Sequence, residues 1–318
     1  MSGTLETVIP ETSRGARLDQ ALAALFPEYS RSRIQQWIHA GRVAVDGRRL
    51  RPRDLVAGGE RVSLALPAPA SAVHAAQPLA LEIVYEDPAV IVINKPAGLV
   101  VHPGAGNPDR TLLNALLHHA PELAGVPRAG LIHRLDKDTS GLLLVARSEA
   151  AHTVLTRALA AREVTREYQA ICIGRVIGGG TVDAPLGRHP VDRVRRAVRS
   201  DGRPARTTYR VLERFRGHSH LRVHLDTGRT HQIRVHLAHI GHPLVGDPVY
   251  GRRRAPLRAA APELNAALAA FRHQALHAAR LEFPHPTRGE RVEFTVTPPA
   301  DFEALLAALR ADVAARRA

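Results

Sequence analysis

An uncharged segment rich in proline and alanine divides this chain into two unequal parts. Residues 67–78, PAPASAVHAAQP, contain no Asp, Glu, Lys or Arg. Such a composition favours a connecting segment over a packed element. With 318 residues, the chain is long enough for two separate cores. We therefore expect a small domain over residues 1–66, a linker over 67–78 and a larger domain over 79–318.

The first part has the pattern of a small helical domain with a β element. Apolar residues recur at helical spacing over 17–26, and Ser30 is suited to cap a second helix. VAVDG at 43–47 ends in Asp-Gly, a dipeptide typical of hairpin turns, and RVSLAL at 61–66 fits a further strand. We expect the core of this domain over residues 17–66.

In the larger part, predicted strands outnumber helices and often follow one another directly. This order favours an α+β fold with a mixed, largely antiparallel sheet. The tail, DFEALLAALRADVAARRA, is expected to be a surface helix. The other predicted helices are TLLNALLHH, a segment capped by Ser148, THQIRVHLAHI and PELNAALAAFRH, and the predicted strands lie in LEIVYEDPAVIVINK, LLLVA, REYQAICIG, TTYRVLERF, SHLRVHLDT, LHAARLEF and RVEFTV.

The charge of the chain is strongly positive and unevenly distributed. The formal net charge is +14, and 42 of the 44 basic residues are arginines, the two lysines being Lys95 and Lys137. Residues 30–53 contain seven arginines and one acid, and residues 186–216 contain ten arginines and three acids. Clusters of this kind are typical of surfaces that contact the phosphates of nucleic acids. An arginine-rich surface without a specific partner is the alternative interpretation.

Several other classes of protein lack support in the sequence. No apolar run is long enough for a transmembrane helix, no signal peptide is recognisable, and Cys172 is the single cysteine. We therefore expect a cytoplasmic protein with no membrane association. The histidines at 231, 236, 239 and 242 do not have HExxH spacing, and no phosphate-binding loop or GxSxG motif occurs. We expect no metal and no cofactor.

The segment HRLDKDTSG, residues 133–141, combines two carboxylates with basic side chains directly before the apolar strand LLLVA. A charged turn at the end of a buried element is a common location for an active site, although a solvated surface loop fits the same pattern. The segment GRTHQIR places Arg234 next to apolar Ile233, where an arginine can extend inward to a carboxylate.

Long segments of the chain resemble the bacterial ribosomal large-subunit pseudouridine synthases of the A, C and D type, and most closely the D branch. They include INKPAGLVVHPGAGNPDRTLLNALL, PRAGLIHRLDKDTSGLLLVA, GRTHQIRVHLAHIGHPLVGDPVYG and QALHAARLEFPHP, while residues 17–66 resemble the S4 RNA-binding domain. The resemblance implies an isomerase that converts uridine to pseudouridine in 23S ribosomal RNA or a large-subunit precursor. The D branch points to the stem-loop of helix 69.

The resemblance also assigns residue roles. It implies that Asp136 is the nucleophile, that Arg234 pairs with it and that Tyr168 stacks on the target base. It further implies that Arg134 fills the space left by the flipped base and that Leu281 forms an apolar wall of the pocket.

The S4-like domain is expected to bind RNA through Arg31, Arg33 and Arg42, and the protein is expected to act as a monomer. The alternative function is a non-catalytic S4-type assembly factor of the ribosome, which an intact set of Asp136, Tyr168 and Arg234 disfavours.

Overall fold

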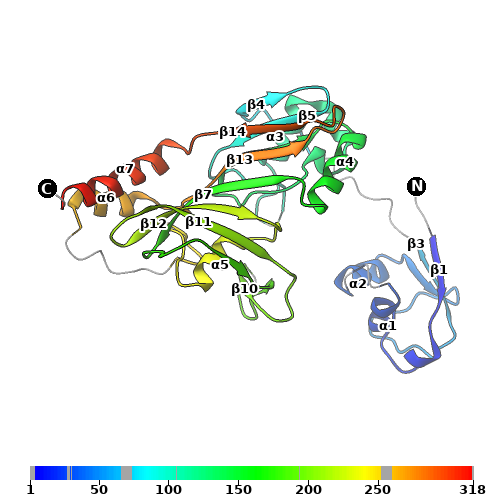
Figure 1. Cartoon of the computed structure of the whole chain (residues 1–318). Helices are drawn as coiled ribbons and strands as arrows, with labels where there is room; N and C mark the ends of the chain where they lie inside the picture. Colours follow the sequence, from blue (N-terminus) through cyan, green and yellow to red (C-terminus); the bar gives the residue numbers. More distant parts are fainter. Residues whose placement is uncertain are drawn as a thin grey trace. The chain divides into compact units, whose positions relative to one another are not determined.

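The computed structural model describes residues 4–26, 29, 31–65, 74–104, 106–192, 194–251 and 260–316, without the side chains of residues 32 and 33. The chain divides into two compact units, Met1–Val73 and His74–Ala318 (Figure 1). The predicted linker falls partly outside the described residues. The described end of the linker, from residue 74, belongs to the larger unit. There the side-chain Nδ2 of Asn114 donates to the carbonyl of Ala75 at 2.8 Å.

The smaller unit packs two helices against a three-stranded sheet. The helices are α1 (Leu18–Leu25) and α2 (Arg31–His39), and the strands have the order β1 (Thr4–Val8), β3 (Arg61–Ala65), β2 (Val43–Val45). Trp37 lies in its core with apolar residues of both helices and all three strands, among them partly buried Leu5 of β1. A short 3₁₀ helix, η1 (Glu11–Ser13), follows β1.

Pairing between distant strands adds to the local predictions for this unit. The polar N-terminus contributes β1, which pairs antiparallel with β3 although the predicted core began at residue 17. Asp46-Gly47 forms the predicted hairpin turn, with positive φ angles and Val45 bridged to Arg48, and β2 pairs in addition with the distant β3. Both outcomes depend on pairing between segments far apart in the sequence. The predicted cap, Ser30, lies outside the described residues.

The larger unit is built on a nine-stranded mixed sheet, which confirms the α+β prediction. The strand order is β4-β5-β6-β13-β7-β12-β11-β8, with β14 beside β13. Among the described strands of this sheet, neighbours run antiparallel except for β6 and β13, which are parallel. The strands are β4 (Ile83–Glu86), β5 (Val90–Lys95), β6 (Ser140–Ala146), β7 (Thr165–Ile173), β8 (Gly180–Asp183), β11 (Arg206–Arg214), β12 (His218–Leu225), β13 (Leu276–Pro284) and β14 (Arg291–Thr295).

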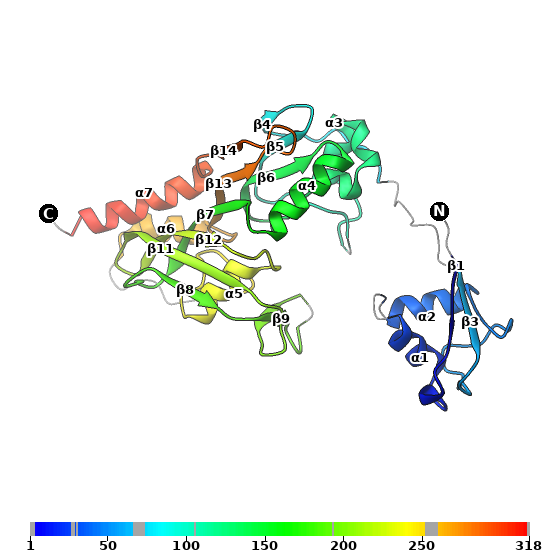
Figure 2. The same cartoon turned by 45° about the vertical axis from the view of Figure 1, so that its right-hand side comes forward.

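Helices cover both faces of this sheet (Figures 1 and 2). Apolar residues of α3 (Leu112–His119) and α5 (Gln232–His239) share one core cluster with Tyr168 of β7. Residues of α4 (Glu149–Ala160) pack in a second cluster, and those of α6 (Pro262–Ala270) and α7 (Ala300–Ala314) in a third. The tail helix α7 is thus anchored by buried Phe302 and Leu309. The short elements η2 (Pro121–Gly125), η3 (Pro127–Gly130), β9 (Leu186–Arg188) and β10 (Arg196–Val198) complete the unit.

Within the described part of the chain, no helix combines the length and hydrophobicity needed to cross a membrane. The same residues contain no group of three or more His, Cys, Asp or Glu side chains arranged to hold a metal ion. The histidines of α5 illustrate why. Buried His236 bonds to the Thr207 hydroxyl and the Ala184 carbonyl, both at 2.9 Å, and so belongs to the packing of α5.

Candidate active site

Asp136 lies in the turn between His133 and β6, with 15% of its side chain exposed. Its carbonyl accepts a hydrogen bond from the Thr139 amide at 3.1 Å, which closes the turn. Fully buried Lys95, at the end of β5, donates to the carbonyls of Lys137, Pro96 and Leu99 at 2.9, 2.7 and 2.9 Å. The three donors of one ammonium thus tie the turn that contains Asp136 to the neighbouring strand.

Arg234 of α5 contacts Asp136 and a second aspartate at the same time. Its Nη1 lies 3.0 Å from Oδ2 of Asp136. Its Nε and Nη2 donate to the two carboxylate oxygens of buried Asp247 at 2.8 and 3.0 Å. Such a two-point contact fixes the plane of a guanidinium. The direction of the bond to Asp136 is therefore set by Asp247.

Asp247 is itself held by its own turn. Its Oδ1 accepts hydrogen bonds from the amides of Val249 and Tyr250 at 2.8 and 3.0 Å. Burial alone would raise the pKa of Asp247, but the Arg234 guanidinium and these amides outweigh burial and lower the pKa. The carboxylate consequently stays ionised at neutral pH. Asp247 stands in the GDPVYG segment, where the sequence pattern alone had indicated no role for it.

His231 and Tyr250 form the other side of the aspartate. His231 Nε2 lies 3.9 Å from Oδ1 of Asp136, and its Nδ1 lies 2.8 Å from the Tyr250 hydroxyl. The Arg234 guanidinium sits over the Tyr250 ring, 5.1 Å from its centroid. Burial lowers the pKa of His231, which favours the neutral ring at pH 7. Sequence patterns missed these residues because their role depends on contacts across the fold.

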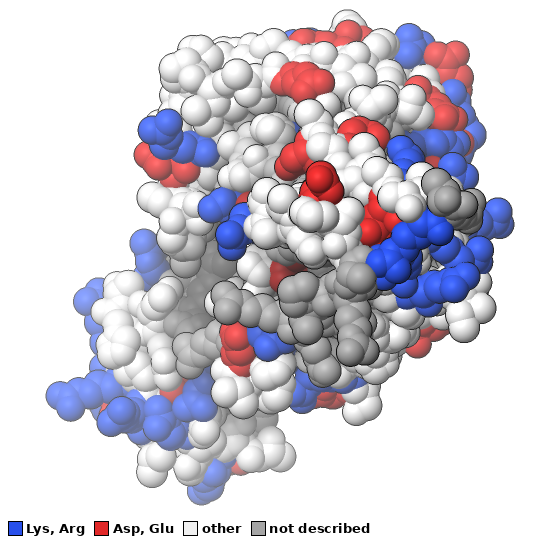
Figure 3. Space-filling model, turned by 90° about the vertical axis from the view of Figure 1, so that its left-hand side faces the viewer, with Lys and Arg blue, Asp and Glu red and all other residues white. Residues whose placement is uncertain are grey.

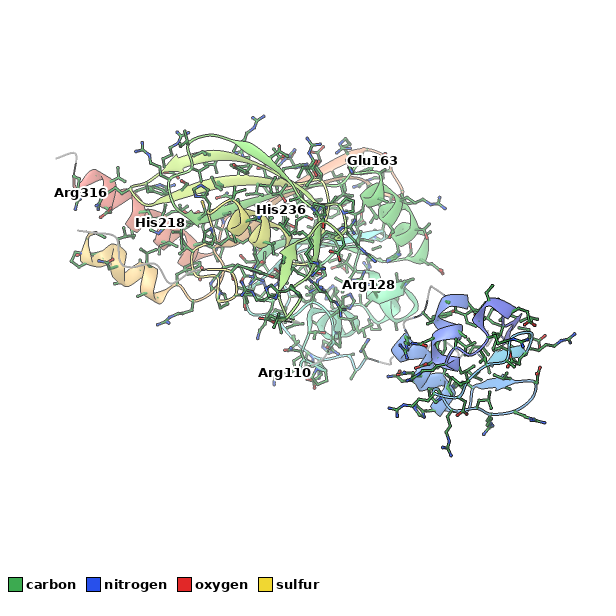
Figure 4. The ribbon with its side chains drawn as sticks, turned by 90° about the horizontal axis from the view of Figure 1, so that it is seen from below. Arg110, Arg128, Glu163, His218, His236 and Arg316 are labelled. Carbon is green, nitrogen blue, oxygen red and sulfur yellow. The ribbon has the colours of Figure 1, made fainter. Side chains whose placement is uncertain are left out.

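A pocket of about 560 Å³ opens beside Asp136. Asp136, Arg234, Tyr168 and Arg134, the residues that the resemblance assigns to the site, all line it. Tyr168 is 4% exposed, and burial raises the pKa of its phenol, which therefore remains protonated. A second hollow of about 420 Å³ shares Asp136, Arg134 and Arg234 with the first. Figure 4 labels Arg128 and His236, which mark η3 and α5, two elements that contribute residues to the pocket.

Leu281, which the resemblance assigns to an apolar wall, is not among the residues that line this pocket. It is buried in the cluster under α4, with Phe283 and Leu155. The leucine of β13 that lines the pocket is Leu276. A β-bulge between Ala278 and Arg280 interrupts the regular pairing of β13 between these two leucines. The resemblance by itself did not show which of the two leucines lines the pocket.

The three arginines predicted to bind RNA in the smaller unit have different environments. Arg42 is exposed, whereas the side chain of Arg33 lies outside the described residues. Arg31 donates to buried Asp19 at 3.1 and 2.9 Å, and Arg17 binds the same carboxylate. Arg31 therefore has a structural role that local sequence patterns did not indicate.

Comparison with known proteins shows the family to which the chain belongs. A model of the RNA pseudouridylate synthase family matches residues 89–239, and an S4 domain model matches residues 16–62. The chain is 53% identical to ribosomal large subunit pseudouridine synthase D of Yersinia pestis over 309 residues, which cover 97% of this chain and 95% of that protein. The corresponding protein of Pseudomonas aeruginosa is 55% identical over 304 residues, or 96% of this chain and 95% of the relative.

A solved structure, human RNA pseudouridylate synthase domain containing 1, matches 74% of this chain and 90% of its own, with 29% identity and a TM-score of 0.56. The similarity to the bacterial synthases extends over both units. The Asp136 pocket lies within the segments that carry it. The chain therefore belongs to the ribosomal large subunit pseudouridine synthases, which are isomerases.

Proposed function

We propose that this protein isomerises specific uridines of 23S ribosomal RNA, in the stem-loop of helix 69, with Asp136 as the nucleophile. The observation that carries the proposal is the position of Asp136, partly exposed in a pocket, with Arg234 at 3.0 Å. The names of the bacterial relatives support a large-subunit substrate. We further propose that the enzyme acts in the cytoplasm as a monomer, without a cofactor.

The reaction breaks the C1′–N1 bond of uridine and forms a C1′–C5 bond. N1 gains a proton and C5 loses one, so no electrons and no group leave the nucleoside. A carboxylate held close to the sugar and the base can react with the nucleoside, while the pocket retains the detached base. Asp136 supplies that carboxylate, and Arg234 orients it and balances its charge.

The other pocket residues take the roles that a flipped nucleotide requires. Tyr168 offers a flat ring on which the base can stack. Arg134 is exposed beside the nucleophile and can occupy the gap left in the RNA stem. Leu276, rather than Leu281, supplies an apolar wall. The S4-like unit adds phosphate contacts through Arg42.

Release of tritium from C5-labelled 23S RNA tests the catalytic role. The wild-type protein should release tritium, and Asp136→Ala should abolish release while leaving the Kd for RNA within about threefold. Asp138→Asn, in the same turn, is the matched control and should remain active. Persistent release by Asp136→Ala would exclude this nucleophile, and release by neither protein would favour the assembly-factor function.

Mapping pseudouridines in rRNA from a strain that lacks the gene tests the substrate. We expect the helix 69 positions to revert to uridine and to be restored by the wild-type gene. Loss of pseudouridine elsewhere, with helix 69 unchanged, would contradict the proposed target. Light scattering of the purified protein should give the mass of one chain.

A further inference from the structure

Six arginines surround the active-site pocket. Arg128, Arg134, Arg162, Arg166 and Arg229 line the pocket together with Arg234. In the described part of the structure, Arg234 alone of these six forms an ion pair with an acid. The pocket's acids are already engaged, because Asp136 contacts Arg234 and Asp226 lies 3.2 Å from Arg206. The pocket therefore carries an excess of positive charge.

Basic side chains are also unevenly distributed over the molecular surface. On the face drawn in Figure 3, Lys and Arg gather densely at the right edge, while acidic side chains are scattered singly or in small groups. Most surface arginines can be balanced by water and counter-ions. Water and counter-ions cannot balance the charge of a buried arginine. The surroundings of each pocket arginine therefore decide whether it needs a ligand.

Arg166 is the pocket arginine with the greatest need of a partner. It is 7% exposed, and its Nε is buried without a hydrogen-bond partner among the described residues. The hydrogen bond that Nη2 makes, to the Leu225 carbonyl, is long at 3.5 Å. A guanidinium remains charged at any physiological pH, and removing it from water without a compensating contact is strongly unfavourable. Arg166 thus offers unused donors and a full positive charge.

The fold directs this side chain into the pocket. Arg166 precedes Tyr168 by two residues on β7, so both side chains project from the same face of the sheet. Gly228 leaves room for the guanidinium, because a Cβ at that position would lie 2.8 Å from Nη1 of Arg166. Packing therefore defines the position of the Arg166 guanidinium, between β7 and the turn after β12.

His133 provides a second unused donor in the same pocket. Its Nε2 accepts a hydrogen bond from the Leu144 amide at 3.2 Å and therefore carries no proton. Burial, reinforced by the charges of Arg166 and Arg128, lowers the pKa of His133 to about 3, and the ring is neutral at pH 7. The ring proton must then reside on Nδ1. That atom is buried and has no partner in the part of the chain described.

We propose that Arg166 and His133 form a phosphate subsite, which binds a backbone phosphate flanking the uridine that reacts at Asp136. A phosphate group can accept hydrogen bonds from both side chains, which line the same pocket, and its charge neutralises the guanidinium. A uracil carbonyl could accept hydrogen bonds, but it would leave the buried charge unbalanced. The proposal rests on the proposed function in that the pocket must bind an RNA nucleotide; it does not require Asp136 to be the nucleophile.

The test removes the negative charge of one backbone phosphate of the RNA. Stem-loop substrates would carry a single methylphosphonate on the 5′ or the 3′ side of the target uridine, and binding would be measured in an Asp136→Asn background to prevent turnover. We expect one of the two neutral linkages to raise the Kd by about 10- to 100-fold. In a protein that also carries Arg166→Gln, the unmodified RNA should bind weakly by a similar factor, and the same linkage should add less than about threefold.

Controls separate this effect from misfolding. Arg222→Gln, on the opposite face of the neighbouring strand β12, should keep the full methylphosphonate penalty. His133→Gln should reduce that penalty in part. The modified RNAs with the Asp136→Asn protein also report on the subsite without any further change in the protein, whether or not Arg166→Gln folds normally.

The subsite would be refuted if the methylphosphonate raised the Kd equally in the proteins with and without Arg166→Gln. It would also be refuted if neither modified linkage raised the Kd. Tritium release is measured in parallel with the wild-type protein. If the methylphosphonate raises the Kd only when Arg166 is present, while the wild-type protein releases no tritium, the subsite is supported and the proposed function is refuted. If the wild-type protein releases tritium but neither methylphosphonate raises the Kd, the proposed function is supported and the subsite is refuted.

Discussion

Asp247 binds the guanidinium of Arg234 through both carboxylate oxygens, at 2.8 and 3.0 Å. This leaves Nη1 of Arg234 directed at Asp136, 3.0 Å away. The pair is buried, so its geometry is not averaged by water. Asp247 thus positions Arg234 and, through it, Asp136, the proposed nucleophile.

Asp247→Asn should therefore impair catalysis more than RNA binding. The amide retains one acceptor but loses the two-point ionic contact, and small misalignments of a catalytic group can reduce rates by about 100-fold. We expect kcat to fall by about 10- to 100-fold, with the Kd for RNA nearly unchanged. Asp301→Asn, at exposed Asp301 of α7, is the control. Wild-type kcat in Asp247→Asn would contradict the positioning role.

Lys95→Met should destabilise the protein, since three carbonyls would lose their common donor. Each unsatisfied buried acceptor costs about 1–3 kcal/mol, so the free energy of unfolding should fall by about 3 kcal/mol or more. Urea unfolding followed by circular dichroism measures this change. Lys137→Met alters the other lysine of the chain, which is exposed, and should leave stability unchanged. Equal stabilities of the two variants would refute this account.

Gly141→Ala should disturb the parallel contact between β6 and β13. Gly141 has a φ of 108°, and an added Cβ would lie 2.3 Å from the Ala278 carbonyl oxygen. We expect a reduction of at least about 2 kcal/mol in unfolding free energy, because the clash is with backbone. Thermal melts measure this change. Gly178→Ala, at a position where an added Cβ would meet no atom within 4 Å, should leave the stability nearly unchanged. A neutral Gly141→Ala would show that the two strands can separate at little cost.

Asp19→Asn should weaken the smaller unit in a pH-dependent way. Desolvation alone would raise the pKa of Asp19, but hydrogen bonds from Arg17, Gln35 and Arg31 lower it from 3.8 to about 2. The ionised carboxylate therefore stabilises the fold above pH 3.8, and this contribution disappears as the pH falls through 2.

Because the arginine partners are partly exposed, we expect a difference of about 1–2 kcal/mol between wild type and Asp19→Asn at pH 7. The difference should shrink between about pH 4 and pH 2. Trp37, the single tryptophan of the chain, lies in the core of this unit, and its fluorescence reports the transition. A difference that stays constant over this whole range would argue against an ionic role for Asp19.

Arg42→Gln should reduce the salt dependence of RNA binding. Removing one phosphate contact lowers the slope of log K against log salt by about 0.7–0.9. Arg14→Gln provides a control in the same unit, because Arg14 is exposed and paired with Glu11 at 2.9 Å. Identical slopes for wild type and Arg42→Gln would exclude this phosphate contact. Arg31→Gln should instead lower the stability of the unit through Asp19.

The sequence by itself determined the elements that depend on local order. Helical periodicity and a capping serine predicted α4, and alternating residues predicted β7 and β12. The charged segment 133–141 before an apolar strand indicated a candidate site with two carboxylates. These features follow from side-chain spacing and backbone chemistry within a few residues. The resemblance to a family then added Tyr168, Arg134 and Arg234, which line one pocket in the structure.

Only the tertiary structure decided which distant groups meet. Packing placed Leu276 in the lining of the pocket and Leu281 in the cluster under α4, on either side of a β-bulge in β13. Burial gave Asp247 its role beside Arg234 and left Arg166 without an acid partner among the described residues. Such relationships arise from packing between segments far apart in the chain, because desolvation changes the need of each polar group for a partner and local sequence patterns carry no measure of it.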